Sequence, residues 1–114
     1  MKRLALLLLV IPASTQAENL NLNCFFDRDY TTSTGMSIEV NLFSDEITVE
    51  KSHTKHTSNY EIKKKSPHSY TGLIYYPEFQ NHIVVTKLNE SEYSAAGAQT
   101  EGGLLNLAWY YYCK

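Results

Sequence analysis

Residues 103–114 read Gly-Leu-Leu-Asn-Leu-Ala-Trp-Tyr-Tyr-Tyr-Cys-Lys, and the rest of the chain is organised around this stretch. In an extended strand, side chains alternate between two faces, which here places large apolar groups and one cysteine on a single side. Residues 19–26 repeat the pattern, with the other cysteine on the apolar side and asparagines opposite. The sequence therefore predicts two terminal strands with core faces made of Leu105, Leu107, Trp109, Tyr111 and Cys113, and of Leu20, Leu22, Cys24 and Phe26.

The two cysteines, Cys24 and Cys113, are predicted to form one disulfide that closes the fold end to end. An even number of cysteines in an exported chain favours a structural bridge. A redox-active pair commonly has C-x-x-C spacing, which this chain lacks.

Residues 1–17 have the pattern of an export signal. Lys2 and Arg3 precede eight apolar residues, 4–11, and Thr15-Gln16-Ala17 provides small residues at both recognition positions of a cleavage site. The apolar run is too short for a membrane span, which needs about 20 residues. We expect cleavage after Ala17 and a single domain, 18–114, that is periplasmic or secreted and not inserted in a membrane.

The charge balance of residues 18–114 limits the classes of partner. This segment has eight Lys and Arg against twelve Asp and Glu, a net charge of −4 with neutral histidines. Nucleic acids and acidic membranes are bound by basic surfaces. We therefore expect no nucleic-acid partner and no binding to acidic lipid.

Short segments of alternating apolar and polar residues fill the middle of the chain. Residues 52–58 are polar and are predicted to form a loop, Gly72 is predicted to mark a bulge or bend, and 90–103 fit either a strand or a helical turn. Seven to eight short strands at this spacing are typical of a small antiparallel barrel or sandwich. The predicted fold is all-β, with strands at 19–26, 35–43, 46–51, 59–64, 69–76, 82–88 and 103–114.

Motifs for catalysis are missing from the sequence. It contains no Gly-x-Ser-x-Gly elbow, no phosphate-binding loop and no His-Glu-x-x-His motif. We therefore expect no enzyme activity and no cofactor. His53 and His56 are weak candidates for metal ligands, because no third ligand stands at a fixed spacing from them. The simpler interpretation is that both are exposed polar residues of the loop.

Tyrosine is the most unusual feature of the composition, with nine in the chain. Tyr75, Tyr76 and Phe79 surround Pro77, and Tyr110 and Tyr112 alternate with the core face of the last strand. Such aromatic groups are typical anchors of protein interfaces. We predict that these five residues form a partner-binding surface. The alternative is that they cover an ordinary antiparallel sheet, which favours tyrosine anyway.

In size, export and cysteine placement, the chain resembles the periplasmic lysozyme inhibitors, which are short exported β-barrel domains with a bridge near the chain ends. The inhibitory loop motifs of that family do not occur here, so the resemblance implies no site residue. It implies a small binding protein that inhibits or neutralises a protein partner, such as an envelope-attacking enzyme or a toxin. A lipocalin-like carrier of a small apolar ligand and a structural envelope protein are the alternatives. The sequence indicates neither the partner nor the oligomeric state.

Overall fold

The computed structural model of the chain describes residues 19–114, and the predicted export signal lies outside these residues. Each of eight antiparallel strands pairs with the next along the chain, and β8 returns to β1 to close a barrel. The strands are β1 (Asn19–Phe25), β2 (Ser33–Asn41), β3 (Glu46–Lys51), β4 (His56–Lys65), β5 (Ser69–Tyr75), β6 (Gln80–Lys87), β7 (Tyr93–Glu101) and β8 (Leu104–Cys113). The all-β prediction is confirmed, and the barrel is the architecture found. None of the described residues belongs to a helix able to cross a membrane.

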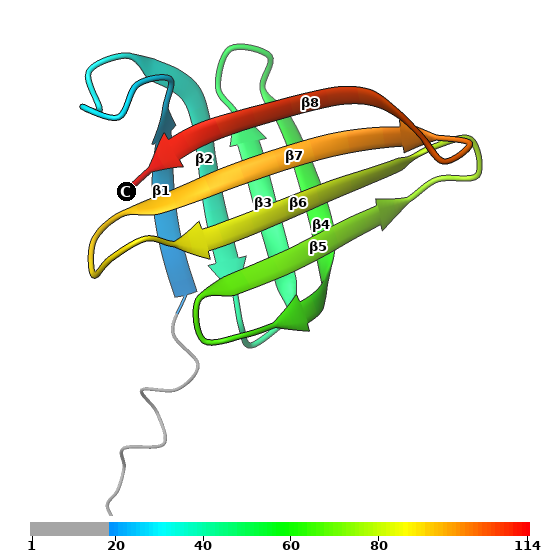
Figure 1. Cartoon of the computed structure of the whole chain (residues 1–114), viewed down its shortest axis with the longest axis horizontal. Helices are drawn as coiled ribbons and strands as arrows, with labels where there is room; N and C mark the ends of the chain where they lie inside the picture. Colours follow the sequence, from blue (N-terminus) through cyan, green and yellow to red (C-terminus); the bar gives the residue numbers. More distant parts are fainter. Residues whose placement is uncertain (1–18) are drawn as a thin grey trace, which may run out of the picture.

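The barrel consists of two crossing layers. In Figure 1, β1 to β4 stand steeply on one side and β5 to β8 run across them. The β5–β6 and β7–β8 hairpins project past β3 and β4, and their ends are adjacent because Gln80 pairs with Thr100. We call residues 75–80 and 100–105, the ends of these two hairpins, the double-hairpin tip.

The core lies where the layers cross, and alternation along the strands supplies it. On β2, Ile38 and Val40 face inward and pair with Val49 and Ile47 of β3. Each aliphatic side chain of this size contributes about 1.5 to 3 kcal/mol when fully buried. The buried set is Leu22, Cys24, Met36, Ile38, Val40, Ile47, Val49, Tyr60, Ile83, Val85, Ala95 and Cys113.

The seam of the barrel, where β1 meets β8, is short. Only Cys24 with Cys113 and Phe25 with Tyr112 are in register. The predicted disulfide joins Cys24 and Cys113, both fully buried, across this pair. Asn23 and Lys114 exchange backbone hydrogen bonds of 2.9 and 3.0 Å just beyond it. The prediction of end-to-end closure is confirmed.

Three local predictions need correction or completion. The loop predicted at 52–58 is too long, because β4 begins at His56, where the backbone pairs with Lys51 although the side chains are polar. Gly72 marks no bulge in its own strand, and the register shift lies in β4, between Ile62 and Lys64. The glycine is needed because a Cβ there would come within 2.9 Å of the Cβ of Tyr60. The ambiguous stretch 90–103 contains strand β7.

The predicted core faces of the terminal strands are partly wrong. Leu105 and Leu107 are 67% and 60% exposed, because this end of β8 belongs to the projecting hairpin. A register shift between Gln99 and Thr100 also breaks the alternation there, so the face predicted for Leu105 does not continue from Cys113. Phe26 is 56% exposed, because β1 ends at Phe25 after its own register shift.

The β1–β2 loop is held by the carboxylate of Asp27. Its oxygens accept hydrogen bonds from the backbone N–H groups of Thr31 and Thr32 and from the Thr31 hydroxyl. These bonds, with the Thr31 hydroxyl contributing most, hold the pKa of Asp27 below its usual value. The loop lies next to the seam, where the ammonium of Lys114 sits 4.4 Å from the ring centre of Tyr30.

Acid is expected to weaken this loop. A carboxyl whose pKa is lowered by folding contributes stability that is fully present above its unfolded pKa of about 4 and is lost as the pH falls through the folded value. Asp27→Asn should therefore flatten the fall in stability below about pH 4, as measured by urea unfolding at several pH values. Asp29→Asn, at a residue that makes none of these hydrogen bonds, is the matched control. Equal slopes for Asp27→Asn and wild type would contradict this assignment.

Candidate functional site

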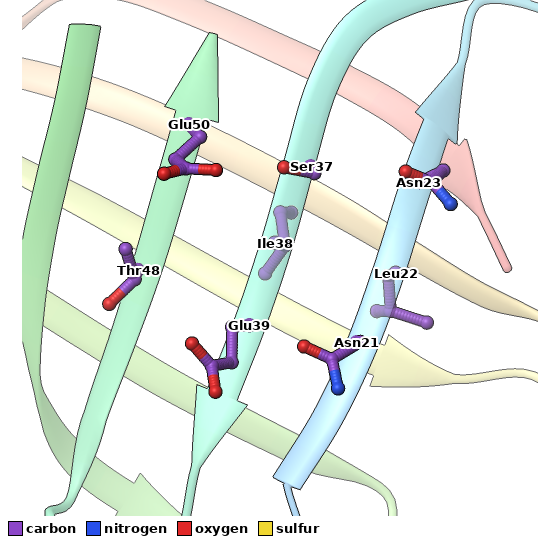
Figure 2. Close-up of a pocket in the computed structure, with 8 residues that line it drawn as sticks. All are labelled: Asn21, Leu22, Asn23, Ser37, Ile38, Glu39, Thr48 and Glu50. Atoms are coloured by element: carbon purple, nitrogen blue, oxygen red, sulfur yellow. The ribbon is translucent and has the colours of Figure 1, made fainter.

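The outer surface of β1 to β3 is polar and acidic. Figure 2 shows residues of these three strands around a shallow cleft of about 190 Å³, with Glu39 on β2 and Glu50 on the neighbouring β3. The side-chain amide of Asn19 donates a hydrogen bond of 2.7 Å to Glu39. The residues that line the cleft are Asn21, Leu22, Asn23, Ser37, Ile38, Glu39, Thr48 and Glu50. This surface is too open to hold a small ligand, but it makes the β1–β3 side of the barrel negative.

The outer surface of β5 to β8 has no ionisable acidic or basic side chain other than His82. The strand registers place four rows of side chains on it, each running from β5 to β8. We call these rows the neutral face. They are Tyr75, Gln80, Thr100 and Leu105; Leu73, His82, Ala98 and Ala108; Thr71, Val84, Ala96 and Tyr110; and Ser69, Thr86, Ser94 and Tyr112. The ring of His82 is tied to the Thr100 hydroxyl at 3.0 Å.

The predicted aromatic loop forms part of the double-hairpin tip. Tyr75 is 68% exposed, the most exposed of the five predicted contact residues. Tyr76 and Phe79 close the hairpin through a backbone hydrogen bond of 2.9 Å, and their ring centres lie 4.6 Å apart. These two rings therefore pack against each other at the turn, while the ring of Tyr75 stays exposed.

A wide recess beside Tyr75 carries carboxylates that the sequence prediction missed. It measures about 680 Å³ and is lined by Ser44, Asp45, Glu46, Asn59, Glu61, Leu73, Ile74 and Tyr75. Lys65 pairs with Asp45 at 2.6 Å and Lys63 with Glu61 at 3.1 Å, whereas Glu46 forms no ion pair within residues 19–114. We call this the acidic recess. It joins the negative side of the barrel to the neutral face at Tyr75.

Tyr110 and Tyr112 lie on the neutral face but away from Tyr75. Tyr110 is 53% exposed, and its ring meets that of Tyr112 edge to face at 5.5 Å. Tyr112 is partly buried, with the guanidinium of Arg28 5.9 Å from its ring centre. The structure thus places Tyr75, Tyr110 and Tyr112 on one face, with Tyr75 at the opposite end from the other two, whereas Tyr76 and Phe79 lie in the turn beside it.

The barrel mouth is a cleft of about 200 Å³, much smaller than the acidic recess. It is lined by Val49, Lys51, His56, Ser58, Tyr60, Asn81, Ala98, Gln99, Leu107 and Trp109. The indole of Trp109 lies against the backbone of Gly97, where an added Cβ would overlap the ring. Burial, with a smaller effect of Tyr76, raises the pKa of Tyr60 above its usual value. The side chains of the protein itself occupy most of the interior.

The two histidines named as weak metal candidates are both exposed. The ring of His53 lies over Gly35, within 2.6 Å of where a Cβ would stand, and His56 lines the barrel mouth. Among residues 19–114, no three side chains of His, Cys, Asp and Glu come together as metal ligands.

Comparison with known protein families, curated proteins and solved structures gives no match to this chain.

Proposed function

We propose that this chain is an exported binding protein, periplasmic or secreted, that inhibits or neutralises a basic protein partner. Its contact surface is Tyr75 with the acidic recess on one side and the neutral face on the other. The function is binding rather than catalysis, and no cofactor takes part.

The observation that carries this proposal is the position of Tyr75. A largely exposed aromatic side chain stands at the rim of a recess with three carboxylates, one of which has no ion-pair partner in residues 19–114. The double-hairpin tip adds Glu78 and Glu101 and contains no Lys or Arg. An aromatic anchor gives affinity, and the carboxylates favour a partner that presents Lys or Arg. A projecting tip of this kind suits a concave basic site.

The carrier alternative has less support. Small-molecule sites in proteins usually measure about 300 to 1,000 Å³ and are mostly apolar. The barrel mouth is smaller than this and is lined by Lys51, His56 and Gln99 as well as Trp109.

Tyr75→Ala is expected to weaken partner binding at least tenfold, because truncation of an interface anchor costs about 2 kcal/mol or more. The melting temperature should change little, since the side chain is mostly exposed. The partner would be captured with residues 18–114 from envelope extract or host secretions, identified by mass spectrometry and titrated by calorimetry.

Glu46→Gln removes a negative charge from the acidic recess and should also weaken binding to a basic partner. The loss should be larger at low salt than at high salt, because salt screens the attraction between exposed charges.

Leu88→Ala is the matched control, because Leu88 is a 43% exposed apolar residue in the loop at the far end of β6. Its affinity should equal that of wild type. If Tyr75→Ala and Leu88→Ala bind the captured protein equally well, the contact surface lies elsewhere. A co-purifying small molecule seen by native mass spectrometry, with no stoichiometric protein, would favour the carrier.

A further inference from the structure

Strand β8 has two edges, and only one of them is fully paired. β7 pairs with β8 from Leu104 to Cys113, whereas β1 is in register with it only at Tyr112 and Cys113. β1 ends at Phe25, and in Figure 1 only β7 runs alongside the rest of β8. Within the described chain, residues 104–111 therefore present a free strand edge.

This edge lacks the usual protection against pairing with another strand. Natural edge strands are commonly short or carry lysine, proline or inward-pointing charges. Strand β8 has ten residues and contains no Asp, Glu, Lys, Arg or Pro. Four of its side chains are largely exposed: Leu104, Leu105, Leu107 and Tyr110.

The backbone of the free edge can continue the ladder that the seam begins. Asn23 and Lys114 exchange two hydrogen bonds, so the N–H and C=O of Lys114 point toward β1. In an antiparallel strand, every second residue points its backbone groups to the same side. The N–H and C=O of Tyr110 and Ala108 therefore point away from β7, toward the free edge.

We propose that a second copy of this chain pairs with this edge, so that the two β8 strands lie antiparallel about a twofold axis at Ala108. In this register the small Ala108 meets its own copy in a hydrogen-bonded pair. Leu107 then lies opposite Trp109 of the other copy on both sides of the axis, before the register shift at Asn106. Aliphatic–aromatic pairs of this kind stabilise antiparallel strands. The two barrels join their β5–β8 layers into one continuous sheet. This inference does not depend on the proposed function.

The free edge of β8 is uncharged and can pair with a second copy of itself. Pairing of β8 with itself brings no like charges together, because the strand has none. A twofold interface needs a surface that complements itself, and the sequence around Ala108 places large residues opposite large ones. Covering the four exposed side chains of β8 named above would bury on the order of 500 Å² of accessible surface per copy, whereas a standard interface buries about 800 Å² per partner. The dimer is therefore reversible and concentration-dependent.

Sedimentation velocity of residues 18–114 tests this inference. The mean mass of the wild type should rise from one to two copies between about 1 and 500 µM. Ala108→Pro removes an N–H that points away from β7, so the barrel keeps its own hydrogen bonds while both donors at the twofold axis are lost. The dissociation constant should rise at least about tenfold. Ala108→Ser keeps the N–H and should dimerise as wild type does.

A second pair of variants covers the case in which Ala108→Pro does not fold. Leu105→Lys places a charge on the exposed edge and should also weaken the dimer, whereas Leu88→Lys should not. A wild type that stays monomeric over the whole range overturns the inference. So does a dimer that survives Leu105→Lys or a folded Ala108→Pro, because it must then use another surface.

Discussion

Replacing Cys24 and Cys113 together by alanine is expected to lower the free energy of unfolding by about 4 to 5 kcal/mol. The bridge closes a loop with a sequence separation of 89, and the chain-entropy model gives a cost of this size for such a loop. This approaches the whole stability of many small domains. Besides the bridge, the seam has only two pairs in register and the two backbone hydrogen bonds between Asn23 and Lys114, so little else holds β1 to β8. Urea unfolding with circular dichroism would measure the loss.

Alanine is chosen because serine would add a second effect. Both cysteines are fully buried, and a hydroxyl there would lose its hydrogen bonds to water. Wild type under reducing conditions is the control and should match the alanine pair. A loss of less than about 1 kcal/mol would mean that the barrel closes without its bridge.

Gly97→Ala is expected to destabilise the barrel by about 1 to 3 kcal/mol, the usual cost of overpacking. Without a steric overlap, alanine inside a strand is more stable than glycine by about 0.5 to 1 kcal/mol. A loss of stability on Gly97→Ala would therefore identify the overlap as its cause. The cause is the indole of Trp109, which occupies the place of the missing Cβ. The ring would have to leave Tyr111, with which it stacks at 5.1 Å. Thermal unfolding followed by tryptophan fluorescence would report both changes.

A double-mutant cycle separates this contact from an effect on the backbone. In the background of Trp109→Leu, Gly97→Ala should be neutral or stabilising, because the overlapping ring has been removed. If Gly97→Ala is equally harmful in both backgrounds, the indole is not the reason that glycine is required.

Local alternation predicted most of the fold. On β2, residues 36, 38 and 40 lie on the predicted core face, since period-two patterns report directly which side of a sheet is buried. The cysteine pairing could also be predicted, because a chain with two cysteines allows one bridge. The exposure of Leu105 and Leu107 could not, because alternation does not reveal how far a hairpin extends beyond its neighbours. The polar start of β4 was missed because backbone pairing, not apolar side chains, forms it.

The candidate site was predictable only in part. Tyr75 stood out because of its aromatic neighbours and Pro77, all within a few residues. The carboxylates beside it come from the β2–β3 turn, β3 and β4, and Glu46, Glu61 and Leu73 meet only through the registers of three strands. The spacing of these residues along the sequence does not predict how the three strands pair. The free edge of β8 likewise depends on where β1 ends beside it, which is a property of the closed barrel.

The closure of the barrel also bears on the rate at which the chain folds. Seven of the eight pairings join strands that are consecutive in sequence, and only β1 with β8 spans the whole domain. Hairpins form in about 1 to 10 µs, whereas contacts between distant residues form late and slow the folding of β proteins. When the oxidised chain refolds from its denatured state, Cys24 and Cys113 are already joined, so the one long-range step becomes a local one. The bridge therefore acts on the speed of folding as well as on the stability of the folded state.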